Sequence, residues 1–380
     1  MGKDKIRVLI VDDSALVRQL LTKILSSDPE IEVVGTAMDP QIAKRKIIDL
    51  KPDVITLDIE MPKMDGLTFL KLIMHNRPTP VVMISSLTAH GAEITMDALE
   101  AGAVDFVSKP TIDVSGTLEN FSEEILSKVK ASAGVRVFGR KALVKPQPRS
   151  DVTEPKLSRT IEPDTVKVDE KYSATVILKR PKKYFQKIKT TDKVIAIGAS
   201  TGGTEAIKEI LLSLPADVPA IVIAQHIPPV FSKAFAERIN QMTDLTVAEA
   251  GDNQLMLPGH VYVAPGDRHL IVIRDGAKYR CKLSDGPPVN RHRPSVDVLF
   301  RSVAQHVGEN ALGIILTGMG ADGARGLKEI LDLGGKTIAQ DEKTSVVWGM
   351  PGEAVKLGAA KKVLPLGSIH QEIMNSFKSK

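Results

Sequence analysis

The stretch Val194 to Gly203, VIAIGASTGG, places one serine among glycines directly after an apolar run. Residues 194–197 have the composition of a short buried strand, and residues 204–214 repeat apolar side chains at helical spacing. Between them, residues 198–202 fit the pattern G-x-S-x-G of a nucleophile elbow. Glycines in such a turn permit the sharp bend that lifts the hydroxyl above the sheet edge, at a helix N-terminus. The pattern predicts acyl transfer with Ser200 as the nucleophile.

Two other interpretations of these residue types are weaker. Glycine-rich turns between a strand and a helix also bind phosphates, but neither G-x-x-x-x-G-K-[ST] nor G-x-G-x-x-G is matched here, which disfavours ordinary nucleotide binding. Cys281 is the runner-up nucleophile. It lies in the alternating run KYRCKLS, where no glycine turn exposes it, so we interpret it as a small strand residue.

A serine nucleophile needs a base, and two residues stand where a base and its partner belong. His226 follows the apolar run 220–224, and Asp322 follows the run 311–316 within the turn TGMGADG. The carboxyl ends of parallel strands open onto one edge of a sheet, so His226 is predicted to take the proton of Ser200 and Asp322 to orient the imidazole. The backbone N–H of Met319, in the same glycine turn, is the expected oxyanion donor.

The choice of base and acid has competitors in the sequence. His260 and His269 flank the run HVYVAPGDRHLIVI and rank below His226 as bases. The glycine-rich turn favours Asp322 over four other aspartates: Asp252, Asp267, Asp285 and Asp297. The chain order Ser, His, Asp matches none of the orders of α/β-hydrolases, chymotrypsin-like and subtilisin-like proteases. A familiar hydrolase fold is thereby disfavoured, whereas triad chemistry, which is defined by geometry, is not.

A second group of polar residues lies near the start of the chain. Asp12 and Asp13 follow the apolar run 6–11, and Asp58 follows the run 54–57. Three carboxylates at neighbouring strand ends repel one another unless a hard cation binds between them, and Mg²⁺ fits best. Ser85 and Lys109 follow the next two strands. A carboxylate, a metal and a cation at one edge predict phosphoryl transfer onto Asp58.

Both groups require parallel sheets to position them. In the first 130 residues five apolar runs alternate with helical patterns, which predicts a parallel sheet covered on both faces. The runs are 6–11, 32–35, 54–57, 81–84 and 104–107, and the helical patterns are 14–27, 39–50, 65–76, 91–101 and 118–130. The last 190 residues predict a second α/β domain, with strands at 194–197, 220–224, 261–263, 270–273 and 311–316 and further helices at 230–241, 294–307 and 321–333.

The segment between the two domains differs in composition. The chain has a net charge of +5, and residues 130–190 carry 16 Lys and Arg against 6 Asp and Glu, so the basic character belongs to this segment. Scattered prolines and mixed charges without sustained periodicity predict a solvated tether rather than a nucleic-acid-binding arm. We therefore expect domains at 1–130 and 191–380, joined by a linker at 131–190.

Length and composition agree with a two-domain soluble protein. The chain has 380 residues, 43% of them hydrophobic and 4% aromatic, which suits α/β cores. A single cysteine excludes an internal disulfide. The first residues lack the features of a signal peptide, and no apolar run approaches 18 residues, so we expect a cytoplasmic protein without membrane insertion.

Residues 6–125 resemble a response-regulator receiver domain, through VDDS, TLDIEMPKMDG, the SS after the fourth strand and SKP after the fifth. The resemblance implies a flavodoxin-like (βα)5 fold. It also implies that Asp58 accepts a phosphoryl group from a histidine kinase, that Asp12, Asp13 and Asp58 hold Mg²⁺, and that Ser85 and Lys109 form the receiver switch. The resemblance further implies that the peptide bond between Lys109 and Pro110 is cis.

Residues 192–376 resemble the catalytic domain of the chemotaxis protein-glutamate methylesterases, through IGASTGG, AQHIPPVF, VYVAPGDRHL, NRHRPSVDVLF and LTGMGADGARG. This implies a doubly wound, mostly parallel α/β catalytic domain without a cofactor of its own, and Ser200, His226 and Asp322 as its triad. The implied substrates are glutamate γ-methyl esters and selected glutamines on chemoreceptors. The implied partners are those receptors and the chemotaxis histidine kinase. We also expect a monomer that is peripheral to the receptor arrays and binds no nucleic acid.

Two folded domains on one tether suggest that the unphosphorylated receiver packs over the catalytic cleft and that phosphorylation weakens the packing.

Two rival functions remain from other classes. A phosphorylation-gated binding protein would use the glycine loop only to hold a ligand and would release no methanol. A nucleic-acid-binding regulator would rely on the basic linker and bind DNA with a steep salt dependence.

Overall fold

The computed structural model describes residues 5–109, 115–135, 172–179 and 192–377. The N-terminal unit is built on a five-stranded parallel sheet in the order β2-β1-β3-β4-β5. Its elements alternate along the chain as the sequence predicts, and their bounds are β1 Ile6–Val11, α1 Ala15–Ser26, β2 Ile31–Ala37, α2 Pro40–Leu50, β3 Val54–Asp58, α3 Gly66–Asn76, β4 Val81–Ser85, α4 Ala89–Glu100, β5 Asp105–Ser108 and α5 Ser115–Ala133.

The C-terminal unit is built on a seven-stranded sheet in the order β14-β13-β12-β6-β7-β9-β8, in which every neighbouring pair is parallel. The chain starts in the middle of this sheet at β6, moves outward to β7, β8 and β9, and then returns to β12 on the other side of β6. The strands are β6 Val194–Ala199, β7 Ala220–Gln225, β8 Thr246–Glu249, β9 His260–Val263, β12 Ala311–Ile315, β13 Lys336–Gln340 and β14 Lys362–Leu364.

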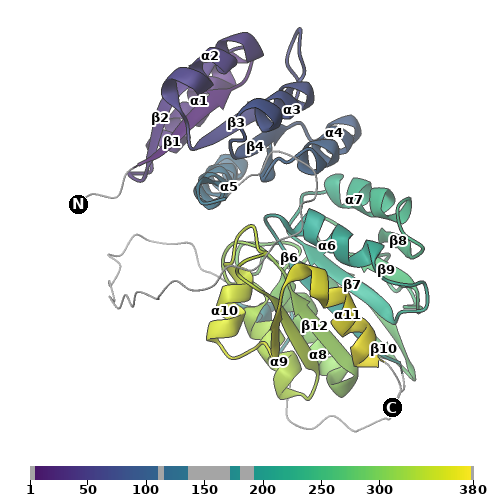
Figure 1. Ribbon diagram of the computed structural model, residues 1–380. Helices are drawn as coiled ribbons and strands as arrows, with labels where there is room; N and C mark the ends of the chain where they lie inside the picture. The colour runs from purple at the N-terminus through teal and green to yellow at the C-terminus, as the bar shows by residue number, and fades with distance from the viewer. Residues whose placement is uncertain (1–4, 110–114, 136–171, 180–191, 378–380) are drawn as a thin grey trace, which may run out of the picture.

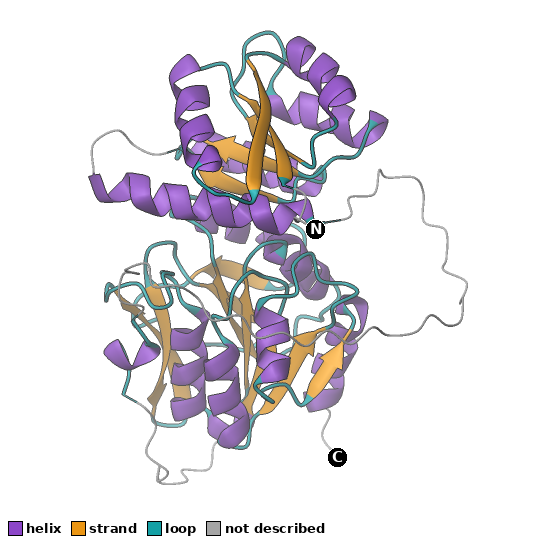
Figure 2. Cartoon of the chain, turned by 90° about the vertical axis from the view of Figure 1, so that its left-hand side faces the viewer, coloured by secondary structure: helices purple, strands orange, loops and turns teal. Residues whose placement is uncertain are grey.

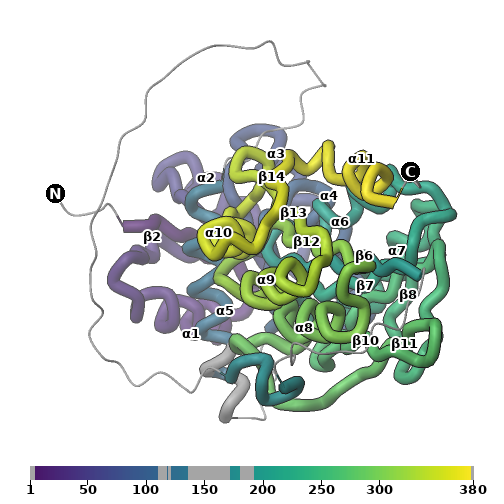
Figure 3. The backbone as a smooth tube through the Cα atoms, turned by 90° about the horizontal axis from the view of Figure 1, so that it is seen from below, coloured from purple at the N-terminus to yellow at the C-terminus, as the bar shows by residue number. Residues whose placement is uncertain are grey.

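Helices cover both faces of this sheet (Figure 3). Side chains alternate along β6, so that Ile195 and Ile197 pack in one core with α6, α7 and α11, whereas Val194 and Ala196 pack in another with α8 and α9. This is the doubly wound arrangement that the sequence predicts. The helices are α6 Gly203–Leu212, α7 Phe231–Asn240, α8 Val296–His306, α9 Ala324–Asp332, α10 Met350–Lys356 and α11 Leu366–Phe377.

Two details of the C-terminal unit differ from the expectation. The predicted strand at 270–273 lies in a separate antiparallel hairpin of β10 (His269–Asp275) and β11 (Lys278–Ser284), and not in the main sheet. The strands β8, β13 and β14 were not predicted. They are three to five residues long, and none of them contains a continuous apolar run like those from which the other strands were predicted.

The predicted linker is described only in part. Helix α5 continues past the expected boundary at residue 130 and ends at Ala133. Residues 172–179, which include the short 3-10 helix η1 (Ala174–Val176), rest on the C-terminal unit. The bond between Lys109 and Pro110 lies outside the described residues. Within the part of the chain that is described, no helix has both the length and the apolar character needed to cross a bilayer.

The N-terminal unit lies over one end of the C-terminal sheet (Figures 1 and 2). Helix α4 packs against α7, and the ring of Phe106 in β5 stacks on Phe231 at the start of α7, with 4.5 Å between ring centroids. Both rings are buried. The two units therefore share a buried apolar contact close to the carboxyl ends of β6 and β7.

Tight packing fixes β6 against α8. A Cβ atom on Gly198 would lie 2.1 Å from Cγ1 of Val296, the first residue of α8. We expect Gly198→Ala to lower the free energy of unfolding by about 1–3 kcal/mol, because the core has no room for the added methyl group. Urea denaturation measures this loss, and Val296→Ala in the same chain should recover part of it. Full stability of Gly198→Ala alone would contradict the packing.

Candidate functional site

The turn between β6 and α6 is anchored to both strands that flank β6. The N–H of Ser200 donates to the carbonyl of Thr317 after β12, at 3.1 Å, and the amide of Gln225 at the end of β7 donates to the carbonyl of Ser200, at 2.9 Å. Gly202 has a φ of 75° and lies against Val346, so no side chain fits there. The glycines place Ser200 where the strand order reverses, the usual position of a site in an open α/β sheet.

His226 lies beside this turn because β6 and β7 pair in parallel, with Ala199 opposite Gln225. Its Nε2 atom lies 2.9 Å from Oδ2 of Asp322. Its Nδ1 atom is buried and has no hydrogen-bond partner among the described residues, and no hydrogen bond joins the ring to the Ser200 hydroxyl there. Catalytic hydrogen bonds are often formed only with substrate present, so Nδ1 is the ring atom left for Ser200.

Asp322 is held at the N-terminus of α8. Its carboxylate accepts hydrogen bonds from the backbone N–H groups of Val296 (2.7 Å) and Asp297 (3.2 Å) and from the side chains of Ser295 (2.9 Å) and Asn290 (2.7 Å). Burial opposes its ionisation, but the hydrogen bond and positive charge that His226 can supply keep the pKa of Asp322 below its usual range. The positive end of the helix dipole also favours the anion.

The four aspartates that compete with Asp322 do not bond to His226. Asp252 accepts from the N–H of Leu283, and Asp267 and Asp285 pair with arginines. Asp297 lies next to Asp322 and accepts from Asn290 and from the N–H of Gly326. Burial, with the nearby charge of Asp322, raises the pKa of Asp297 to about 7.

The two lower-ranked histidines have structural contacts instead. Nε2 of His269 lies 3.0 Å from the carbonyl of Pro287, and its Nδ1 accepts from the N–H of Ser295. His260 contacts the carbonyl of Pro258. Neither ring bonds to Ser200 or Asp322 in the described structure.

His292 is a neighbour of the site that the sequence reasoning missed. Its ring stacks on that of His226, with 3.7 Å between centroids and 12° between planes. Burial and the nearby charge of His226 lower the pKa of His292, so it remains a neutral flat surface against the imidazole. The run NRHRPS gives no periodic signal for this contact, which depends on a long-range approach of two loops.

The turn after β12 brings backbone close to Ser200. A Cβ atom on Gly318 would lie 2.8 Å from Cβ of Ser200, and the carbonyl of Gly318 accepts from the N–H groups of Gly349 and Met350. The N–H of Met319 has no acceptor among the described residues. A backbone N–H group that has no acceptor in the protein can donate a hydrogen bond to an oxyanion.

The N-terminal unit covers this edge with polar contacts. The hydroxyl of Thr201, next to Ser200, donates to the buried carboxylate of Asp105 in β5 at 2.5 Å. Arg238 of α7 pairs with Asp97 and Glu100 of α4. Helix α5 contributes two further contacts, between Glu123 and Arg291 (2.7 Å) and between Ser127 and the sulfur of Met319 (2.8 Å).

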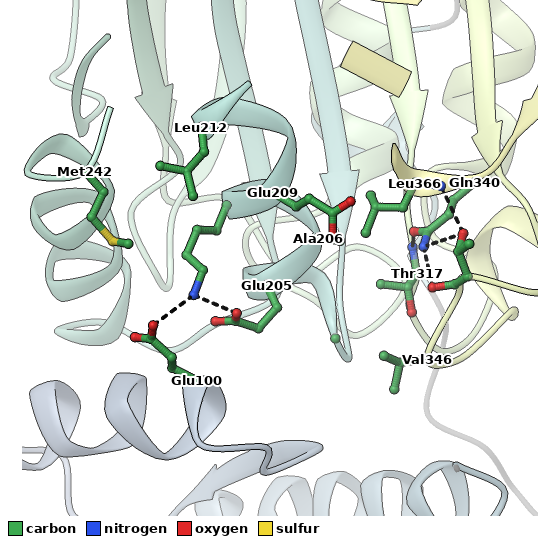
Figure 4. Close-up of a pocket in the computed structure, with 13 residues that line it drawn as sticks. Glu100, Glu205, Ala206, Glu209, Leu212, Met242, Thr317, Gln340, Val346 and Leu366 are labelled. Carbon is green, nitrogen blue, oxygen red and sulfur yellow. Dashed lines mark hydrogen bonds and ion pairs between the residues drawn. The ribbon is translucent and has the colours of Figure 1, made fainter. Parts of the chain in front are cut away.

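A cavity of about 430 Å³ lies beside the turn that carries Ser200 (Figure 4). Gly202 and Thr317 form one wall, and Glu100 of α4 approaches from the N-terminal unit. Lys208 bridges Glu100 and Glu205 across it. This opening therefore lies between the two units and does not include Ser200 among its lining residues.

The second predicted group is also assembled. Carboxylate oxygens of Asp12, Asp13 and Asp58 lie within 4.8 Å of one another, and Nζ of Lys109 lies 2.8 Å from Asp58 and 3.6 Å from Asp12. The Oδ2 atoms of Asp12 and Asp58 are buried without a hydrogen-bond partner in the described structure. Burial raises the pKa of Asp58 to about 6, despite Lys109. Orphaned carboxylate oxygens of this kind fit a hard divalent cation.

Ser85 and Ser86 are distinguished by their surroundings. Ser85, at the end of β4, is buried, and its hydroxyl accepts from Thr95 at 2.8 Å. Ser86 donates instead to Glu60. The backbone N–H of Lys109 donates to the carbonyl of Ser85 at 2.7 Å, which ties the two expected switch residues together.

Comparison with known proteins covers both units. The sequence profile of the CheB methylesterase domain matches residues 195–373, and that of the response regulator receiver domain matches residues 8–115. A protein-glutamate methylesterase/protein-glutamine glutaminase of Hydrogenovibrio crunogenus is 57% identical over 98% of this chain and 99% of its own length. The chain belongs to this family. Both resemblances stated from the sequence are thereby confirmed.

A second full-length relative and one solved structure are also similar to this chain. A protein of the same description from Geobacter metallireducens is 48% identical over 100% of this chain and 98% of its own length. The crystal structure of the Thermotoga maritima CheB methylesterase catalytic domain is 38% identical, and the match covers 49% of this chain and all of that one, with a TM-score of 0.48. The α/β fold expected for both domains is the one observed.

The raised pKa of Asp58 predicts a pH-dependent cost to the receiver domain. The pKa of Asp58 is about 6 in the folded protein, against an ordinary value of 3.8. The free energy of unfolding should therefore fall as pH rises from about 4 to above 6, by at most about 3 kcal/mol, because the charged carboxylate is disfavoured in the folded state. Without divalent cations, Asp58→Asn should therefore be more stable than the unaltered chain at pH 8 but not at pH 4. Thermal unfolding measures this, with exposed Asp49→Asn as control. A gain that does not depend on pH would contradict the assignment.

Proposed function

We propose that this protein hydrolyses glutamate γ-methyl esters on chemoreceptors, releasing methanol, and deamidates selected receptor glutamines. One observation carries the proposal. The imidazole of His226 is held by Asp322 on one side and offers an unpaired, buried Nδ1 atom at the strand end next to Ser200. The names of full-length relatives support the same activity.

In the proposed reaction Nδ1 of His226 takes the proton of the Ser200 hydroxyl as the oxygen attacks the ester carbonyl. The protonated ring then gives this proton to the departing methoxy group, and methanol leaves the acyl-enzyme. Water, deprotonated by the same nitrogen, attacks the acyl-enzyme and releases the glutamate carboxylate and the free hydroxyl. Asp322 holds the ring by Nε2–H and stabilises its cation in each step.

Met319 is the proposed oxyanion donor, since its backbone N–H lies in the turn that touches Ser200. An ester and a primary amide pass through the same kind of tetrahedral oxyanion, so one donor serves both activities. In the amide reaction protonated His226 gives its proton to the departing amide nitrogen, which leaves as ammonia. No cofactor is required for either reaction.

The receiver domain supplies the control. We propose that a chemotaxis histidine kinase phosphorylates Asp58. Asp12, Asp13 and Asp58 would hold Mg²⁺, whose charge would stabilise the phosphoryl group. Lys109 lies where its ammonium can contact the phosphoryl oxygens. Ser85, tied to Lys109 through the backbone, is the proposed switch hydroxyl.

In the unphosphorylated state the receiver domain masks the site. Thr201 and Met319, which flank the proposed reaction centre, both bond to receiver residues, so a receptor helix cannot reach Ser200 while these contacts persist. A tenfold activation needs a shift of only about 1.4 kcal/mol between closed and open arrangements. We propose that the protein acts as a monomer in the cytoplasm, at receptor arrays, and not on nucleic acid.

The nucleophile is tested by Ser200→Ala. The rate of methanol release from methylated receptor membranes, in the presence of a small phosphodonor, should fall by a factor on the order of 10⁶, as for other triad knockouts. Ser213→Ala, an exposed serine at the end of α6, is the matched control and should retain full activity. Methanol release by Ser200→Ala at a rate near that of the unaltered chain would refute the proposed role of Ser200.

The masking contact is tested by Arg238→Ala, which removes the ion pairs between α7 and α4. Charge-assisted contacts of this exposure are worth about 1 kcal/mol, so the rate without phosphodonor should rise about threefold to tenfold. The rate with phosphodonor should not change. Lys233→Ala is the control, because Lys233 pairs with Glu237 of its own helix. An unchanged or lower unphosphorylated rate in Arg238→Ala would contradict masking.

A further inference from the structure

One part of the linker is built into the catalytic domain. Residues 172–179, here called the clamp segment, lie against the β10–β11 hairpin and α8. Ala174 is 4% exposed and packs with Ile271, Val289 and Val298, and Ile177 and Leu178 pack around this group. A Cβ atom on Gly286 would lie 2.2 Å from Ile177, so the glycine leaves the space that this side chain fills.

Polar contacts fix the same segment. The guanidinium of Arg301, which is 4% exposed and pairs with Glu329, donates to the hydroxyl of Thr175 and to the carbonyl of Leu178, each at 3.2 Å. The amide of Gln305 donates to the carbonyl of Lys179 at 2.5 Å. A buried guanidinium needs acceptors for its remaining N–H groups, and the clamp segment supplies two of them.

The clamp segment also reaches the residues that hold the triad. The carbonyl of Tyr172 accepts from the N–H of Asn290 at 3.0 Å. Asn290 and Arg291 form the tip of a tight turn closed by Val289 and His292, with φ values of 51° and 70°. The side chain of Asn290 donates to Asp322, and the ring of His292 stacks on His226. One turn therefore contacts two of the three proposed catalytic residues.

This turn needs support from outside. A turn with positive φ at both central residues favours asparagine followed by glycine, and here Arg291 stands at the glycine position with a φ of 70°. Strained backbone of this kind persists only where the surroundings impose it. The clamp segment provides an acceptor for the backbone of Asn290 and part of the apolar surface under Val289. Without it the turn can relax and withdraw the Asn290 amide from Asp322.

We propose that the clamp segment positions the triad: by holding the turn 289–292 it keeps Asn290 on Asp322, so that this part of the linker belongs to the catalytic unit. The inference rests on the proposed function and extends it. It makes Ala174 and Asn290 positioning residues, which act through Asp322 and do not touch the substrate.

The test uses full-length chains with Ala174→Asp, which puts a charge into the buried contact and should displace the clamp segment from the catalytic domain. Its control is Val176→Asp, which adds the same charge in the same helical turn at a position that is 49% exposed. We expect Ala174→Asp to lower kcat for methanol release about tenfold with KM unchanged, and Val176→Asp to change kcat less than twofold. Both rates are measured with phosphodonor present.

A double-mutant cycle separates positioning from a general loss of structure. If the clamp segment acts through Asn290, Ala174→Asp should cause no further loss in a chain that carries Asn290→Ala. Full additivity of the two losses would overturn the proposal. Ile177→Ser, a milder change in the same contact, should lower kcat in the same direction with an unaltered melting temperature.

Two measurements that need no substrate turnover distinguish a failure of this proposal from a failure of the proposed function. Absence of methanol release from the unaltered chain would refute the proposed function itself. In that case the rate at which a fluorophosphonate labels Ser200 and the hydrogen exchange of residues 289–292 still decide the inference. Faster exchange and slower labelling in Ala174→Asp, but not in Val176→Asp, support it, whereas equal values for the two variants reject it.

Discussion

The proposed catalytic site depends on a buried carboxylate held at the start of a helix. Asp322 accepts from two backbone N–H groups of α8, from Ser295 and Asn290, and from the ring of His226. Burying a carboxylate is costly unless it is fully hydrogen-bonded, and here the helix terminus meets that requirement. The donors also fix the position of the carboxylate. The carboxylate in turn determines the orientation of the His226 ring and which of its nitrogen atoms is hydrogen-bonded.

The doubly wound sheet makes this arrangement possible. Because β6 lies between β7 and β12, the residues that follow these three strands meet at one edge of the sheet. His226 and Asp322 are in contact there although 96 positions separate them in the sequence. The same edge is the surface to which the receiver domain binds, through Thr201 and Met319. In the proposed mechanism catalysis and its control therefore use adjacent residues of the same loops, and separation of the two domains would expose Ser200.

Much of this arrangement follows from sequence patterns. The apolar runs that precede Ser200, His226, Asp322 and Asp58 predict strands, and parallel strands bring their carboxyl ends together. Both groups of polar residues could therefore be predicted. Asn290 and His292 could not, because they belong to a tight turn whose approach to the site depends on packing between distant segments. The clamp segment was predicted to be part of a solvated tether. Its apolar residues are too few to produce a periodic pattern, and their burial depends on Gly286 and Arg301, more than 100 positions away.

The most direct test is the protonation of the His226 ring, read by ¹⁵N NMR of the full chain with labelled histidine and assigned with His226→Gln. Asp322 accepts from Nε2, so the neutral ring should carry its proton on Nε2 and leave Nδ1 bare toward Ser200. A neutral ring with its proton on Nδ1 would leave Ser200 without a base and would contradict the account.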